Sequence, residues 1–72
     1  MFPVEEDNMQ NLTLREKEVL KLICEGKTNV DIAKNLIISV NTAKAHVSNI
    51  YQKLNVSDRV QAAVWAISHN VF

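Results

Sequence analysis

Apolar residues recur every three or four positions in four segments of the chain, which is the spacing of a helix with one buried side. The longest segment covers residues 39–54. At about 100° per residue its apolar stripe falls on one side of a helix. The stripe consists of Val40, Ala43, Val47, Ile50 and Leu54. The opposite, polar face is small and free of charge, with Asn41, Ala45, Ser48, Asn49 and Gln52. Lys44 and Tyr51 border this face on one edge, and Thr42, His46 and Lys53 border it on the other.

The other three segments also begin at helix-capping residues. Thr13 with Glu16 forms a capping box, and the helix that follows is expected to end at Gly26. Thr28 with Asp31 starts a helix of about eight residues. Ser57 is expected to cap a fourth helix over about 58–69, with Asp58 at its positive end. The inward positions of the first two helices are Val19, Leu20, Ile23, Ile32, Ala33 and Leu36.

The connections between these segments are short. Only two or three residues separate the second helix from Ser39, which caps the third, and small Ala33 allows the two helices to approach closely. This spacing predicts a helix-turn-helix, with a plain helical hairpin as the alternative. Asn55 is suited to a left-handed turn after Leu54. Residues 1–11 are acidic, contain Pro3 and show no period, so they are expected to be a tail or linker before a domain over 12–72.

Composition narrows the fold class to all-α. The chain has 72 residues, 47% of them hydrophobic, and only one Gly and one Pro, which leaves few turns for a β-rich fold. The single Cys24 cannot build a disulfide framework or a metal site, and we interpret it as a buried thiol in a reducing cytoplasm. No stretch is long and apolar enough for a membrane span.

Charge is distributed unevenly although the formal net charge is zero. Residues 1–26 carry six acids and three bases, whereas residues 27–72 carry five bases and two acids. The segment 40–54 contains no acid. Its polar face could meet base edges in a DNA major groove while its cationic borders meet phosphates. From this helix alone, an ordinary surface helix explains the pattern equally well.

No arrangement of residues indicates catalysis. The alternating charges of residues 15–18 suit solvated ion pairs on a surface helix, and His46 and His69 are too isolated for a metal site. We therefore expect no enzyme activity, no metal and no cofactor.

Many residues at fixed spacing are similar to one known family. They are Leu12 to Leu20, Gly26, Asn29, Ile32, Ala33, Leu36, Ile38, Ser39, Thr42, Lys44, His46, Val47, Ile50, Lys53, Leu54, Val56 and the run from Arg59 to Trp65. Over about residues 10–72 the chain resembles the LuxR-type helix-turn-helix, and most closely the C-terminal output domain of NarL/FixJ-class response regulators.

The resemblance implies a four-helix, sequence-specific transcription regulator in the bacterial cytoplasm, associated with the nucleoid when bound. It implies duplex DNA with two half-sites, a homodimer on that DNA, an N-terminal receiver domain and RNA polymerase as partners, and no membrane. The chain is expected to be a piece excised from a longer regulator; a small stand-alone regulator is the alternative. For function, the alternative is a helix-turn-helix relic that binds another protein through its fourth helix.

The resemblance also assigns base contacts. Members use the positions of Lys44, Ala45 and Ser48, and some place a lysine where Asn41 stands. This chain departs from the basic pattern at Asn41 and Ser48 and has Ala43 where valine is common, so its preferred DNA sequence stays open. Phosphate contacts are expected at helix N-termini and cationic edges, from Lys27, Thr28, Asn29, Thr42 and Lys53. For His46, both packing and phosphate contact remain open.

The fourth helix carries a second functional expectation. Arg59, Ala62, Ala63 and Ala66 share a face that allows close packing on the first and third helices. An adjacent C-terminal strip is apolar and consists of Val60, Val64, Ile67 and Val71. We expect this strip to be a twofold dimer contact, and the alternative is that it closes a broad core. Trp65 is expected on a third side, near Ala62 and His69.

Overall fold

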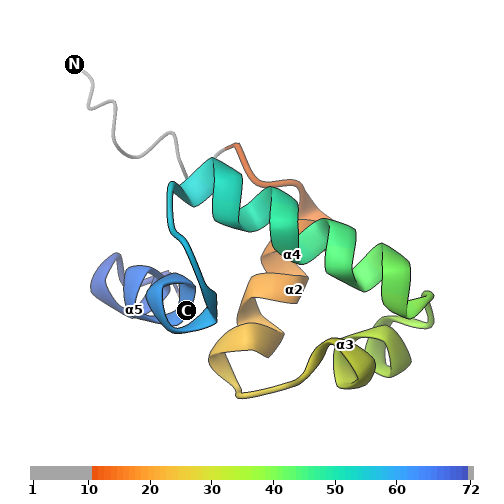
Figure 1. Ribbon diagram of the computed structural model, residues 1–72. Helices are drawn as coiled ribbons and strands as arrows, with labels where there is room; N and C mark the ends of the chain where they lie inside the picture. Colours follow the sequence, from red (N-terminus) through yellow and green to blue (C-terminus); the bar gives the residue numbers. More distant parts are fainter. Residues whose placement is uncertain (1–10, 72) are drawn as a thin grey trace.

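Four helices make up the computed structural model, which describes residues 11–71 (Figure 1). They are α2 (Leu14–Cys24), α3 (Asn29–Leu36), α4 (Val40–Leu54) and α5 (Arg59–Ser68). No strand occurs in these residues, so the all-α expectation is confirmed for them. The tail predicted for residues 1–11 lies outside the described residues except for Asn11. None of the helices within 11–71 is long and apolar enough to cross a membrane.

Three of the four predicted helix caps are present. Thr13 and Glu16 form a capping box, as do Thr28 and Asp31. Ser39 accepts a hydrogen bond from the Thr42 amide at 3.0 Å. Each cap satisfies a backbone N–H that a helix start otherwise leaves unpaired.

The fourth predicted cap was wrong by one residue. Asp58, not Ser57, accepts a hydrogen bond from the Gln61 amide at 2.9 Å, and α5 therefore begins at Arg59. The Asp58 carboxylate is a better partner for the positive end of a helix than a neutral hydroxyl. The Ser57 amide instead donates to the Gln61 side chain at 2.7 Å.

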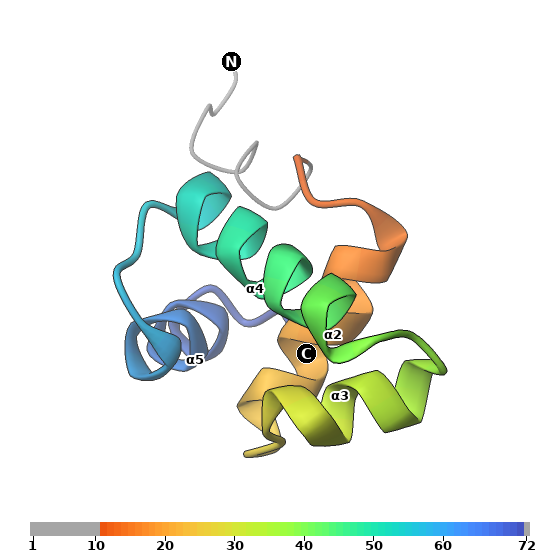
Figure 2. The same cartoon turned by 45° about the vertical axis from the view of Figure 1, so that its right-hand side comes forward.

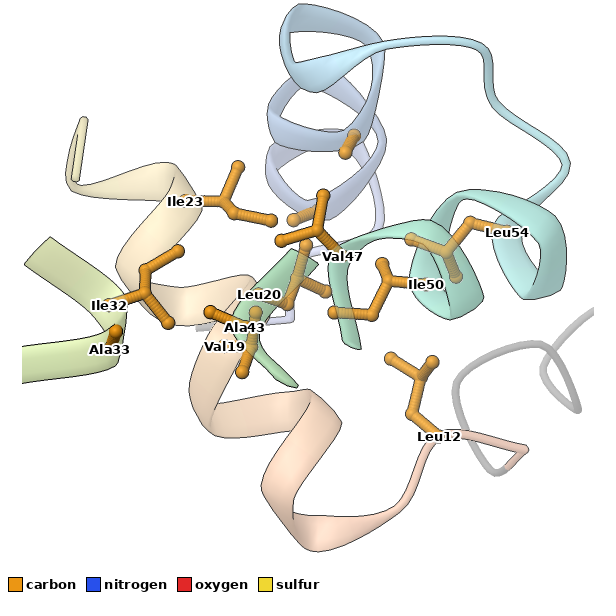
Figure 3. Packing of buried hydrophobic residues seen from close by; sticks show 12 residues of the cluster. Leu12, Val19, Leu20, Ile23, Ile32, Ala33, Ala43, Val47, Ile50 and Leu54 are labelled. Carbon is orange, nitrogen blue, oxygen red and sulfur yellow. The ribbon is translucent and has the colours of Figure 1, made fainter. Parts of the chain in front are cut away.

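The apolar stripe of α4 occupies the centre of the fold. Ala43, Val47, Ile50 and Leu54 are buried as predicted, and Val40 packs at the edge of the core. Figure 3 shows these side chains directed toward those of α2 and α3, with Leu12 approaching from the segment before α2. Cys24 is only half-buried at the core margin, and not fully buried as expected; burial raises the pKa of its thiol, with a smaller contribution from Glu25.

The other helices surround the inner side of α4. This helix packs on α2, α3 and α5, while α2 also packs on α5. In Figure 1, α4 crosses one side of the molecule, and α3 and α5 lie toward its opposite ends. In Figure 2, α3 and α5 both lie below α4. Because three helices share one side of α4, its polar face is left exposed.

Residues in the left-handed conformation end several helices. Gly26 (φ 85°) and Asn55 (φ 58°) take it as predicted. Asn70 (φ 56°) also takes it after α5, where the Asn70 amide donates to the Ile67 carbonyl and the Val71 amide to the Ala66 carbonyl. This pairing of the last carbonyls turns Val71 back toward the core.

Ile37, at the end of α3, adopts a conformation that its sequence does not suggest. Its φ is 58° and its side chain is 91% exposed. A β-branched residue is strained in this region, where glycine or asparagine is usual. The Ile38 amide donates to the Ala33 carbonyl at 3.0 Å just after it, so this residue forms the turn of the helix-turn-helix.

A buried ion pair joins the start of α2 to the end of α4. Lys53 Nζ donates to Glu16 Oε1 at 2.8 Å and to the Asn11 carbonyl at 3.0 Å. The same carboxylate oxygen accepts from the Thr13 amide at 3.0 Å. Burial by itself would raise the pKa of Glu16, but the bonds from Lys53 and Thr13 and the charges of Lys53 and His46 lower it below its ordinary value. Solvated ion pairs were expected in residues 15–18. Arg15 and Glu18 do pair on the surface, but the expectation was wrong for Glu16, which is 4% exposed.

The strained turn predicts a stabilising substitution. Ile37→Asn should raise the free energy of unfolding by about 0.5–1 kcal/mol, since asparagine tolerates a positive φ and the exposed isoleucine loses no packing. Urea unfolding followed by circular dichroism measures the change. Ile37→Val keeps the β-branched side chain and should leave stability as it is. Lower stability in the asparagine variant would contradict a left-handed residue at this turn.

The buried pair predicts a loss of stability that depends on pH. The lowered pKa of Glu16 means that its contribution is present above the pKa of the unfolded chain and is lost as pH falls through the folded pKa. Lys53→Met keeps the aliphatic stem but leaves the buried carboxylate without its cation. Because Lys53 is about one-third exposed, the variant should cost about 1–3 kcal/mol at pH 7, and clearly less at acidic pH, where Glu16 becomes neutral. Urea unfolding at the two pH values measures this, with exposed Lys21→Met as the control. An equal cost at both pH values would attribute the loss to packing alone.

Candidate nucleic-acid interface

The polar face of α4 is a continuous, exposed surface. Asn41, Lys44, Ala45 and Ser48, the predicted base contacts, are all exposed on it, as are Asn49 and Gln52. The fifteen residues of α4 give a cylinder about 22 Å long and about 10–12 Å wide, which matches a major groove about 12 Å wide. The face has no carboxylate, and Lys44 supplies a cation at its edge. These side chains can donate to or accept from base edges without repelling phosphates.

The N-terminus of α4 adds an exposed hydroxyl next to this face. The Ser39 and Thr42 hydroxyls lie 2.9 Å apart, and the Ser39 oxygen already accepts from the Thr42 amide. When the Ser39 hydroxyl donates to Thr42, the Thr42 hydroxyl keeps its own hydrogen for another acceptor. The structure therefore leaves Thr42 able to donate to a phosphate, as the sequence suggests.

The N-terminus of α3 brings the other three candidate phosphate contacts together. Thr28 caps the helix, Asn29 is its first residue, and Lys27 immediately precedes the cap. The Asn29 Oδ1 atom is buried and has no hydrogen-bond partner among residues 11–71. The hydrogen bonds from Thr28 lower the pKa of Asp31, with smaller contributions from Lys27 and Lys34. Lys27 is thus close enough to act on groups at this helix end.

Arg59 contacts this loop, which the sequence did not suggest. Its Nη2 atom donates to the Lys27 carbonyl at 2.7 Å. The sequence analysis placed Arg59 on the small-residue face of α5, and Ala62 and Ala66 of that face are indeed buried. In the sequence, the only sign of this contact is a charged residue among alanines on a packing face, where a guanidinium needs a hydrogen-bond partner.

Lys53 is not grouped with the other candidate phosphate contacts. Its ammonium is directed to Glu16 and the Asn11 carbonyl at the opposite end of α4 from Ser39. A phosphate would have to compete with a buried carboxylate for it. His46 is half-buried, and its charge helps to lower the pKa of Glu16, so it also lies on the side of this ion pair.

On α5, three of the four predicted dimer residues are exposed. Val60, Val64 and Ile67 have 71%, 56% and 73% of their surface accessible, so they do not close the core. The placement of Val71 in the same strip was wrong. The helix ends at Ser68, and the turn at Asn70 packs Val71 against the core. Trp65 stacks on His69, with ring centroids 4.0 Å apart, beside the exposed valines.

The described part of the chain offers little to other chemistry. No group of three or more His, Cys, Asp or Glu side chains within residues 11–71 could hold a metal ion. The fold and the exposed face of α4 are therefore the features to compare with known proteins.

Comparison with known proteins agrees with this architecture. The family model described as "Bacterial regulatory proteins, luxR family" matches residues 10–66. The transcriptional regulatory protein LiaR of Bacillus subtilis is 56% identical over 57 residues, which cover 79% of this chain and 27% of LiaR. YhcZ of the same bacterium, an uncharacterized transcriptional regulatory protein, is 49% identical over 67 residues, or 93% of this chain and 31% of YhcZ.

The response regulator VraR of Staphylococcus aureus is 50% identical over 60 residues, which cover 83% of this chain and 29% of VraR. The chain thus spans less than a third of the length of each of these relatives. The matched residues contain all four helices except the end of α5, and the helix-turn-helix formed by α3 and α4 lies wholly within them. The chain belongs to the luxR family of bacterial regulatory proteins, whose helix-turn-helix is a DNA-binding domain.

Proposed function

We propose that this chain binds duplex DNA in a sequence-specific manner as the output domain of a response regulator. The observation that carries the proposal is the exposed, acid-free polar face of α4, held opposite a fully buried apolar stripe. A helix that served only the core would not need a second face so free of carboxylates. Relatives described as transcriptional regulatory proteins and response regulators support the same function.

In this proposal α4 lies in the major groove. Lys44 and Ser48 bond to base edges, Ala45 offers its methyl group to a thymine methyl, and Asn41 reads a base near the start of the helix. The α3 N-terminus and Thr42 bind phosphates on either side of the groove. Lys53 contributes through its ion pair with Glu16, which fixes α4 against α2. These roles are proposals for individual side chains.

Two copies of the chain would meet on DNA through α5. The exposed Val60, Val64 and Ile67 form an apolar surface that one short helix can present to its symmetry mate. Such a contact buries much less area than a standard stable interface, so the isolated chain should be monomeric in dilute solution. Two half-sites would hold the copies close together, and the high effective concentration would make a weak contact sufficient.

The whole regulator would contain more than this domain. Because the match covers less than a third of each of these relatives, we propose an N-terminal receiver domain that controls the output domain, RNA polymerase as a further partner, and action on the chromosome in the cytoplasm. The alternative is a protein-interaction module that uses the exposed surface of α5. Such a module would bind a protein while showing no preference among DNA sequences.

Lys44→Ala tests the proposed base contact. The variant should bind a duplex chosen by selection from random sequences about 1–3 kcal/mol more weakly, and it should tolerate base changes that the wild type rejects. Titration of labelled duplexes measures both. Lys21→Ala, on α2, is the charge-matched control and should keep full discrimination. The salt dependence gives a second measurement: if two protomers together neutralise roughly four phosphates, log affinity against log salt has a slope of about −4. Unchanged affinity and base preference in Lys44→Ala would remove Lys44 from the proposed contacts.

Val64→Asp tests the proposed dimer contact. The charge would lie inside the contact and should abolish cooperative binding to a two-half-site duplex, while helicity and binding to a single half-site persist. Because Val64 is 56% exposed, the fold should tolerate the carboxylate. Leu14→Asp adds the same charge at an apolar residue of α2 that is 80% exposed, and it serves as the control for added charge. Full cooperativity in Val64→Asp would mean that the two copies meet at another surface.

A further inference from the structure

Hydrogen bonds hold the loop between α2 and α3 on both sides of Lys27. The Lys27 amide donates to the Leu22 carbonyl at 3.0 Å, in the turn that Gly26 closes. The Lys27 carbonyl accepts from Arg59 Nη2 at 2.7 Å. The Thr28 amide donates to the Asp31 carboxylate at 3.2 Å. The peptide group between Lys27 and Thr28 is therefore held at both its oxygen and its N–H.

One planar peptide group in this loop is held from both α3 and α5. The Lys27 carbonyl and the Thr28 N–H belong to the same peptide unit, so they turn together. Arg59 binds the oxygen of this unit, and Asp31 binds its N–H. The capping box fixes Thr28 relative to α3 alone, whereas the Arg59 bond fixes the same peptide relative to α5. The peptide at the start of α3 is thus also held by a side chain 32 residues away.

Packing does not replace this bond. α3 packs on α4 through Ile32 and Ala33, while α5 packs on α2 and α4. In Figure 1, α3 and α5 lie on opposite sides of α2. A guanidinium that donates to a carbonyl in a half-buried position forms a strong hydrogen bond with a defined direction.

We propose that Arg59 is a positioning residue for DNA binding: by holding the Lys27 carbonyl, it aims the N-terminus of α3 at a backbone phosphate and ties that contact to α5. This inference rests on the proposed function, because it requires the N-terminus of α3 to meet DNA. It adds a residue that touches no DNA itself. It also gives a physical link between the phosphate contact and the helix proposed to join two copies.

Duplexes with single neutral phosphates test the inference. In a selected duplex, each phosphate near the half-site is replaced in turn by an uncharged methylphosphonate. The phosphate opposite α3 is identified as the one whose replacement no longer weakens binding in Lys27→Met. For the wild type, replacing this phosphate should weaken binding about fivefold to tenfold. In Arg59→Met the same replacement should change affinity less than about twofold. Replacements that act through Thr42, at the start of α4, should keep their full effect.

Control variants separate positioning from charge and from folding. Arg15→Met removes an equal charge from an exposed ion pair and should retain every methylphosphonate effect. Arg59→Lys keeps a donor without the planar fork and should recover part of the effect. Thermal melts set an assay temperature at which all variants are folded; if Arg59→Met is unfolded throughout, Arg59→Lys provides the comparison. Amide spectra of the free protein should shift at Thr28 and Asn29 in Arg59→Met.

The outcomes are distinct. A full methylphosphonate effect opposite α3 in the folded Arg59→Met variant would overturn the inference and leave the proposed function standing. A lost effect with unchanged Thr28 and Asn29 amides would overturn it too, since Arg59 would then touch the phosphate directly. If the wild type selects no duplex and responds to no methylphosphonate, the proposed function itself fails.

Discussion

Burial of the apolar stripe of α4 is the constraint on which the rest of the structure depends. An isolated helix of fifteen residues is marginal in water, so α4 needs tertiary contacts on one side. Ala43, Val47, Ile50 and Leu54 obtain them from three helices at once. Within residues 11–71 the packed helices lie on that side, and the polar residues of the opposite face are exposed. The exposed polar surface proposed to bind DNA is thus a direct consequence of how the core is built.

Two polar contacts complement this apolar core, one near each end of α2. Lys53 joins the end of α4 to Glu16 near the start of α2, and Arg59 joins the start of α5 to the loop after α2. Both use a cation that the sequence alone would count toward DNA binding or surface charge. A net charge of zero is compatible with the proposed function because Lys44 lies beside a face without acids.

Local signals predicted most of the fold. Capping boxes at Thr13 and Thr28, the positive φ of Gly26 and Asn55, and the stripe of α4 each depend on residues within one or two turns of each other. The wrong expectations concern which of two neighbouring residues caps a helix and where the chain turns after a helix. Asp58 displaced Ser57 as a cap, and the turn at Asn70 carried Val71 away from the C-terminal strip.

The candidate site was predictable only in part, because some of its contacts join residues far apart in the sequence. The exposed face of α4 follows from helical spacing, and so does the exposure of Val60, Val64 and Ile67 on α5. The partners of Lys53 and Arg59 lie 37 and 32 residues away, and no local pattern indicates a pairing that exists only after the helices pack. The positive φ of Ile37 was not predictable either, because a β-branched residue gives no local signal for a left-handed turn.

The central claim is that the uncovered face of α4, together with the N-terminus of α3, is the surface that meets duplex DNA. Backbone amide spectra of the chain, recorded while a selected duplex is added at low salt, test it most directly. The account predicts that the largest changes fall on Asn41, Ala45, Ser48 and Asn29, with smaller changes on α5 only when the duplex has two half-sites. Changes confined to the outer surfaces of α2 or α5, with the polar face of α4 unaffected, would contradict it.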